Sequence, residues 1–277
     1  FDSLAEVLAV GNITGGHSLT ISIADDLTTL TAGTSNFRAG VNAGDSIASG
    51  GNYNTVVGDE AGTAITTGDN NVAVGYNSLD ANTTGAGNTA VGTSAMTGNT
   101  TASNNTAVGY LSLDVNTEGT KNTAVGKGSL GANITGDDNT AIGMSTLSLN
   151  TVSDNTAVGS QALDANTSGT QNVAVGTNAL GANTTANGNT AVGYIALLAN
   201  TTGANNTAVG SRALDANLES ADNTAVGYNS MTANTEGHSN TAVGSKSLDA
   251  NTTADNNTAV GYNSMSVNTT GANNTAV

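Results

Sequence analysis

Single apolar residues alternate with small polar ones along most of this chain, and the pattern returns every 17 residues. The motif Asn-Thr-Ala-Val-Gly ends at Gly92 and again at Gly109, and thirteen such glycines mark an array from Gly58 to Gly261. One interval, the one that ends at Gly159, is 16 residues long. A fixed period of this kind indicates a repeat architecture in which each unit packs on its neighbours.

Each unit contains two short runs of strand-compatible residues separated by turn residues. In the unit from Gly75 to Val91 one run is Asn-Thr-Ala-Val and the other surrounds Leu79. Helices are excluded because Asn, Thr, Ser and Gly are poor helix formers. The sequence therefore predicts an all-β, parallel β-solenoid of about 13 coils of 17 residues, with two strands and two bends per coil. At ~4.8 Å per coil its length would be roughly 60 Å.

Four columns of equivalent residues indicate how the coils pack. We expect the motif valine (Val91 and its equivalents) and the Leu or Met of the second run (Leu79 to Met265) to form the core ladders. The threonine of the motif, replaced by Val72 and Val173, is half-buried in this interpretation. Ala90 and its equivalents would then face the opposite side. Since this column is alanine in all thirteen copies from Ala73 to Ala276, one hypothesis packs it against neighbouring chains, and the alternative is close packing within one chain.

Two further columns are asparagine, at Asn82 and Asn88 and their equivalents. Asparagine tolerates left-handed backbone and caps turns with its side chain. Stacked amides can also hydrogen-bond along the axis of a parallel array. A structural ladder is therefore preferred over a ligand-binding role for Asn88.

The first 35 residues lack the period. We expect a cap or adapter at residues 1–35 and the solenoid at residues 36–277, with an irregular first coil at Asn36-Phe37-Arg38-Ala39-Gly40. The chain starts at Phe1 and stops inside a repeat, so we expect it to be part of a longer polypeptide.

Variable positions predict the solvated side of the rod. The second position after each repeat glycine holds Asn77 in one coil and Lys246 in another. Five aspartates of the repeats share one column and five tyrosines another, and neither residue occurs in successive coils of its column. For the aspartates this spacing keeps like charges apart. The residues are Asp80, Asp114, Asp164, Asp215 and Asp249, and the tyrosines Tyr76 and Tyr110, then Tyr194, Tyr228 and Tyr262.

The charge balance limits the partners. Five Lys and Arg against 21 Asp and Glu give a net charge of −16, which argues against nucleic acid and anionic membranes. With no cysteine, neither a disulfide framework nor a thiolate metal site is expected. The sequence also shows no apolar run long enough to span a membrane and no signal-peptide pattern.

No constellation in the sequence predicts catalysis. His17 and His238 are the only histidines and lie in different regions. Asp80 and Asp114 recur as a column instead of converging as a glycosidase pair would. A catalytic site needs a base, a nucleophile and an orienting group in one cleft. We therefore predict a protein that is not an enzyme, with no catalytic, cofactor-binding or metal-binding residues and no cofactor.

Short motifs in the sequence indicate two candidate binding functions. Gly136-Asp137-Asp138 and Gly68-Asp69 are weak candidate cation sites, although the nonapeptide of calcium-binding β-rolls is absent. Adjacent threonines at 83–84, 184–185, 201–202 and 252–253 raise the possibility of ice binding. Ice binders carry threonine on flat strands, whereas these pairs are expected in turns, so an ice-binding solenoid is a remote alternative.

The motif Asn-Val-Ala-Val-Gly at 71–75 and 172–176, with its Thr variants, resembles the head repeats of YadA-like trimeric adhesins. Those heads are trimeric left-handed parallel β-rolls. The form Asn-Thr-Ala-Val-Gly-Tyr with a downstream Ala-Asn-Thr-Thr-Gly is even more similar to repeats of bacteriophage tail fibres. The resemblance covers about residues 54–277 and implies a left-handed coil, a homotrimer and a role at a surface.

The resemblance leads to two expectations about function. The first is a structural segment of a bacteriophage tail fibre on the virion, which presents a host-recognition tip and has other fibre components and a host-surface receptor as partners. The alternative is the head of a bacterial trimeric adhesin at the cell surface, which itself binds host or matrix molecules.

Overall fold

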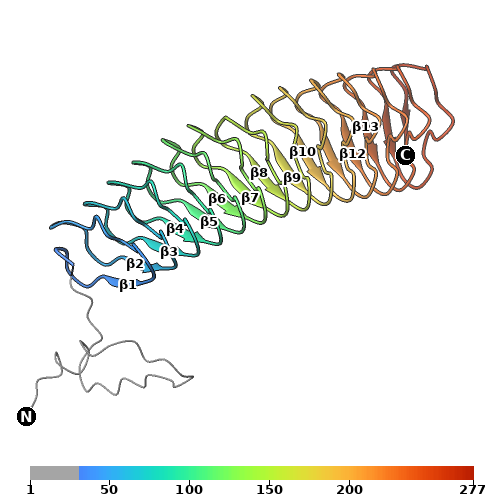
Figure 1. The fold of residues 1–277 in the computed structure, drawn as a ribbon. Coiled ribbons are helices and arrows are strands. Elements are labelled where there is room, and N and C mark those ends of the chain that lie inside the picture. Colours follow the sequence, from blue (N-terminus) through green and yellow to red (C-terminus); the bar gives the residue numbers. More distant parts are fainter. Residues whose placement is uncertain (1–30) are drawn as a thin grey trace, which may run out of the picture.

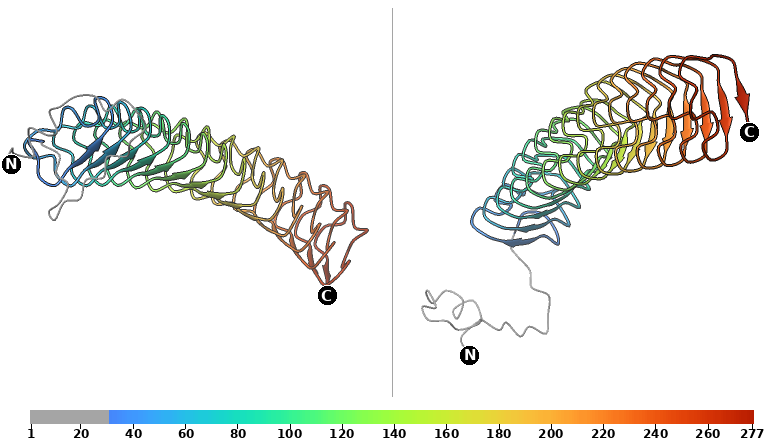
Figure 2. Two further views of the ribbon diagram at one scale, coloured as in Figure 1. Left: turned by 60° about the horizontal axis from the view of Figure 1, so that its bottom comes forward. Right: turned by 90° about the vertical axis from the view of Figure 1, so that its right-hand side faces the viewer.

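The computed structural model describes residues 31–277, which form a long rod of stacked coils (Figure 1). Fifteen parallel strands form one sheet in sequence order. The sheet follows the rod as it curves and twists (Figure 2). Residues 31–277 contain no helix, and so none that could cross a membrane. The prediction of an all-β, parallel solenoid is confirmed.

The strands are short and evenly spaced along the chain. They are β1 (Phe37–Ala39), β2 (Thr55–Val57), β3 (Val72–Val74), β4 (Thr89–Val91), β5 (Thr106–Val108), β6 (Thr123–Val125), β7 (Thr140–Ile142), β8 (Thr156–Val158), β9 (Val173–Val175), β10 (Thr190–Val192), β11 (Thr207–Val209), β12 (Thr224–Val226), β13 (Thr241–Val243), β14 (Thr258–Val260) and β15 (Thr275–Ala276). Neighbouring strands pair in register, so that Ala90 lies beside Ala107. Equivalent residues therefore stack in columns along the rod.

The irregular first coil is present. β1 pairs with β2, and Asn54 donates its backbone N–H to the side chain of Asn36, 18 residues earlier. The cap expected at residues 1–35 lies, apart from its last five residues, outside the described part of the chain.

The 16-residue coil keeps its strand in register because the missing residue comes from a turn. Asn133 Nδ2 donates to the carbonyl of Gly136, three residues later, whereas Asn150 Nδ2 donates to that of Val152, two residues later. The pairing of β7 with β8 is unchanged. The coils therefore tolerate a change of length in this turn.

The prediction of a second strand around Leu79 is wrong. Asn77 and Leu79 both have a φ of +53°, in the left-handed region, so the chain turns sharply instead of extending. Backbone bonds to the next coil continue nevertheless, since Leu79 donates its N–H to the carbonyl of Ala95 at 3.0 Å. Each coil therefore contains one strand and a series of turns that carry the leucine into the interior.

The assignment of the two faces of the strand also needs correction. Ala90 is fully buried in the interior together with Leu79, while Thr89 and Val91 on the same stretch of chain are only half-buried. The predicted valine core ladder is thus wrong, and so is the hypothesis that the alanines pack against neighbouring chains. The alternative, close packing within one chain, is correct, and the leucine ladder is confirmed.

The first coils show why alanine faces inward. There Val56 takes the alanine position, Gly62 the leucine position and Ile65 the position of Asn82. A Cβ on Gly62 would lie 2.8 Å from both Val56 Cγ1 and Ile65 Cδ1. The thin coil therefore encloses a nearly fixed volume, and a leucine in the turn leaves room for only a methyl group on the strand.

Both asparagine ladders are confirmed. Asn88 donates its backbone N–H to Asn71 Oδ1 at 2.9 Å and its Nδ2 to the carbonyl of Ala102 at 2.8 Å. In the other ladder, Asn99 Nδ2 donates to Asn82 Oδ1 at 2.8 Å. These side chains are fully buried. Because buried amides are costly unless paired, the bonds between coils fix the register along the rod.

Candidate functional site

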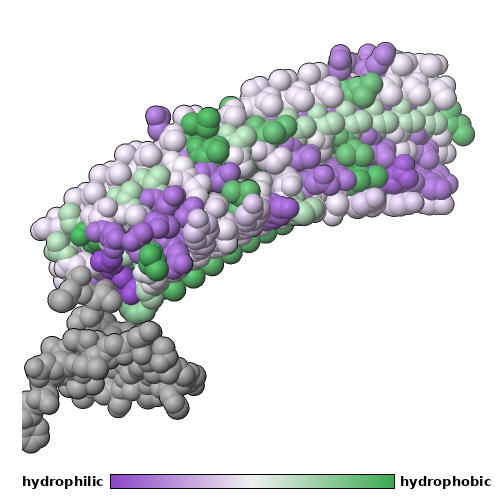
Figure 3. Space-filling view, in the orientation of Figure 1, coloured by the Kyte–Doolittle hydropathy of each residue, from purple (hydrophilic) through white to green (hydrophobic). Residues whose placement is uncertain are grey.

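The outward side of the sheet is the most uniform surface of the rod. We call it the Thr/Val face and define it as the first and third residues of β2 to β14, which are Thr or Val and Val or Ile, respectively. None of these strands contains a charged residue. In Figure 3 a green band follows the lower margin of the rod, where the first strands lie in Figure 1.

The threonines of this face differ from those of the turns. Within residues 31–277 the turn hydroxyl of Thr83 donates to the carbonyl of Thr100 at 3.0 Å, and that of Thr184 donates to Thr201 at 3.2 Å. The strand hydroxyls, such as that of Thr89, form no hydrogen bond in this part of the chain. These hydroxyls are therefore available to hydrogen-bond with water or with another molecule.

The size of the Thr/Val face suits a molecular contact. Twelve steps of ~4.8 Å between β2 and β14 and a width of three residues give about 60 Å by about 10 Å, or roughly 600 Å². This is at the upper end of the apolar patches that monomers expose. It also approaches the area of about 800 Å² that each partner contributes to a standard interface.

Sequence reasoning missed this surface because it assigned its valines to the core. One signal could have found it. Thr and Val exchange at the first strand position, as Val72 and Thr89 show, whereas the second position is alanine in every strand from β3 to β15. Exchange of a hydroxyl for a methyl group is easier at a surface than in a closely packed interior.

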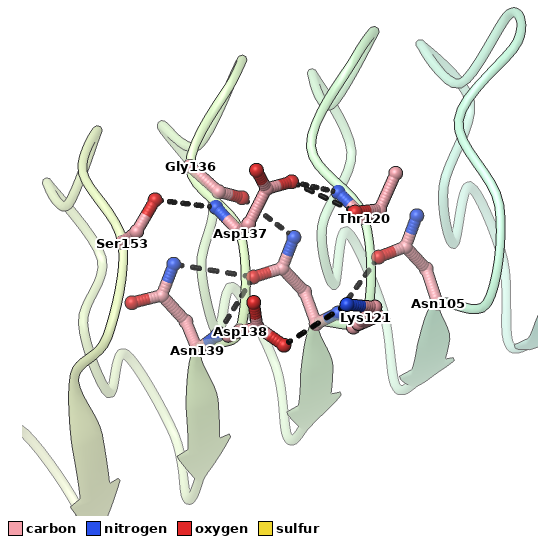
Figure 4. Close-up of polar contacts among 9 residues, drawn as sticks. Asn105, Thr120, Lys121, Gly136, Asp137, Asp138, Asn139 and Ser153 are labelled. Carbon is pink, nitrogen blue, oxygen red and sulfur yellow. Dashed lines mark hydrogen bonds and ion pairs between the residues drawn. The ribbon is translucent and has the colours of Figure 1, made fainter.

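The candidate cation sites are built into the contacts between coils, as Figure 4 shows for Gly136-Asp137-Asp138. Asp137 Oδ1 accepts hydrogen bonds from Thr120, from its N–H at 2.6 Å and from its Oγ1 at 2.9 Å. Asp138 pairs with Lys121 at 4.0 Å, and Asp69 accepts the N–H of Asn52 at 2.6 Å. No group of three or more His, Cys, Asp or Glu within residues 31–277 could hold a metal ion.

His238 has the same kind of role as Asp137. Its Nδ1 accepts the N–H of Ala221 at 3.0 Å, and its own N–H donates to Asp255 Oδ1 at 2.7 Å. The ring nitrogen thus serves as an acceptor between coils, which is a structural role. His17, the other histidine, lies outside the described residues.

Asp80 is held in an unfavourable environment. Its Oδ1 is buried without a hydrogen-bond partner, and burial raises the pKa of its carboxyl, with a smaller contribution from the negative charge of Glu60. Burial also raises the pKa of Asp114 and Asp164 in the same column. The ionised forms of these carboxylates therefore destabilise the rod at neutral pH.

We expect Asp80→Asn to stabilise the rod at neutral pH, because the neutral amide avoids the cost of desolvating a charge. A raised pKa in the folded state means that the wild type gains stability as the pH falls through that value. The difference in unfolding free energy between variant and wild type should therefore shrink on acidification and vanish below the ordinary aspartate pKa. Urea denaturation at several pH values measures it, and a constant difference would contradict the assignment.

The distinctive surface of residues 31–277 is thus a long sheet face whose strands, β2 to β14, carry no charged residue. A comparison of this chain with protein-family models, with curated proteins and with solved structures finds no match.

Proposed function

We propose that this chain is a structural segment of a homotrimeric surface fibre and that three copies associate through their Thr/Val faces. The observation that carries the proposal is the uncharged face of valine side chains and unpaired threonine hydroxyls along the rod. A contiguous apolar strip of this size, bordered by polar turns, is typical of an interaction surface. The trimer and the left-handed coil sense rest on the resemblance to the adhesin and tail-fibre repeats.

In this proposal the rod acts as a spacer. Coils that each contact only their neighbours build a stiff element whose length increases with the number of repeats. On a bacteriophage tail fibre it would hold a host-recognition tip away from the particle, joined to other fibre components. The alternative is a bacterial adhesin head at the cell surface, whose outer sides bind host or matrix molecules.

Ice binding remains a second candidate because of one observation. The threonines that form a regular column are those of the strands, about 4.8 Å apart, and not the turn pairs, whose hydroxyls bond to the next coil. An ice lattice, however, requires a flat face, and this sheet curves and twists (Figure 2). The curvature of the sheet therefore favours the fibre proposal over ice binding.

The molar mass in solution tests the proposal. We expect the wild type to have the mass of three chains by light scattering. Lysine at Val175, Val192 and Val209 should give a folded monomer, since these side chains point outward and three ammonium groups would not fit in an apolar interface.

A matched control places lysine at Ser168, Thr185 and Thr202, which are exposed turn residues of the same three coils. This variant carries the same added charge at the same spacing and should remain a trimer. A wild type that is monomeric at high concentration would refute the fibre. If that monomer slowed the growth of ice crystals, the ice-binding alternative would replace it.

A further inference from the structure

A second surface lies at the corner where each strand ends. The residue after the repeat glycine is tyrosine at Tyr194, Tyr228 and Tyr262, which are 57%, 53% and 74% exposed. These coils are two apart, and the coils between them have Ser211 and Ser245 at the same position. Two coils correspond to ~9.6 Å. The rings therefore form an evenly spaced row separated by small residues.

Nearly all tyrosines of the chain stand in this column although their side chains are largely exposed. One of them, Tyr110, has Lys127 Nζ 6.0 Å from the centre of its ring. The chain has 6 Tyr, 2 Phe and no Trp, and five of the six tyrosines stand in this one column. The earlier pair, Tyr76 and Tyr110, are 55% and 50% exposed. Leaving half of each aromatic ring in water is unfavourable, so a row of such rings suggests a ligand.

Charged groups alternate with the rings. Arg212 and Lys246 directly follow the two serines, so a cation lies in each coil between two tyrosines. Arg212 Nε pairs with Asp215 Oδ2 at 3.1 Å, and Asp249 occupies the same place in the coil of Lys246. The stripe thus alternates rings with cations, and a carboxylate three residues after each cation leaves it with no net charge.

We propose that this stripe, from Tyr194 to Tyr262, binds an extended, uncharged polysaccharide. The apolar C–H face of one sugar stacks on each tyrosine ring, since an aromatic face attracts such polarised hydrogens. The sugar between two rings lies over the cation of the intervening coil, where Arg212, whose side chain is 54% exposed, donates to the sugar hydroxyls. Two coils match two sugar units, so alternate sugars meet equivalent groups.

Charge decides against an acidic polysaccharide. The cations of the stripe are matched by Asp215 and Asp249, and the chain as a whole carries −16. A polyanion would be repelled over long range. An uncharged chain has no such penalty and can accept hydrogen bonds from Arg212 and Lys246.

The stripe is not part of the Thr/Val face, and its binding does not depend on the trimer. If the fibre proposal is correct, an uncharged polysaccharide is the chemical class of the fibre's receptor. Measuring the molar mass of the same samples separates the two proposals, because sugar binding by a monomer would support this one alone.

Titration calorimetry with cellohexaose and with konjac glucomannan, both uncharged and extended, tests the inference. We expect the wild type to bind both, and serine at Tyr194, Tyr228 and Tyr262 together to weaken binding at least tenfold. Serine occurs naturally in this column at Ser160, Ser211 and Ser245, so the variant should fold. Tyr53→Ser is the matched control, because Tyr53 is 61% exposed but stands in another column.

Three results would overturn the inference. One is no binding of either uncharged polymer to the wild type. Another is equal binding by the wild type and the folded triple serine variant. The third is stronger binding of alginate, an acidic polysaccharide, than of glucomannan, which would show that charge and not stacking selects the ligand.

Discussion

Replacing Gly176 by alanine should destabilise the solenoid by more than about 3 kcal/mol, because the new methyl group has no room and the backbone is strained. Gly176 has a φ of +135°, and a Cβ there would lie 2.3 Å from the carbonyl oxygen of Gly193. The obstacle is the backbone of the next coil, which cannot move without breaking the sheet. Thermal unfolding and local hydrogen exchange around β9 and β10 measure the loss.

The control for this prediction is Gly128→Ala. Gly128 has a φ of +62°, but no atom lies within 4 Å of the place that its Cβ would take. Only the left-handed backbone disfavours the substitution, which costs about 1 kcal/mol. If the two variants were equally stable, close approach of successive coils would not be the reason for the glycine column.

The second large effect concerns a single amide. Asn189→Asp should destabilise the rod by about 3 kcal/mol, because a buried carboxylate would replace a group that must donate. Asn189 is fully buried, and its Nδ2 donates to the carbonyl of Gly203 at 2.9 Å. Chemical denaturation at neutral pH measures the difference.

The same change two residues earlier should have almost no effect. Asn187 is exposed, and its Oδ1 accepts from the N–H of Thr170 at 2.7 Å. Asp69 and Asp137 already accept equivalent bonds in this column. Asn187→Asp should therefore stay within about 0.5 kcal/mol of the wild type. Equal losses in both variants would show that the asparagine ladder does not depend on its donors.

The period, the position of the strands and the two asparagine ladders could be predicted from the sequence because each is a matter of spacing. The side of the strand that faces the interior could not be predicted in this way. Alternation separates Ala90 from Thr89 and Val91, but hydrophobicity then favours valine for the core. The deciding quantity is the volume left opposite Leu79, which depends on how sharply the coil bends.

That bend is also why the prediction of a second strand fails. Leucine seldom adopts a positive φ, so the sequence around Leu79 is typical of a strand. In every coil from Leu79 to Met265 the Leu or Met nevertheless has a positive φ, because this conformation brings its side chain to the interior. The Thr/Val face could not be predicted from the sequence either, because hydrophobicity assigns its valines to the core. The spacing of the tyrosines is visible in the sequence, but the exposure of their side chains is not.

The short coil that ends at Gly159 has a practical consequence. One residue is absent from its turn, yet the strands on either side keep their pairing. The turn that follows Asn150 is therefore a place where foreign peptides could be spliced in without disturbing the sheet. Equivalent turns recur in every coil, so a designer could set the interval between two displayed peptides in increments of ~4.8 Å.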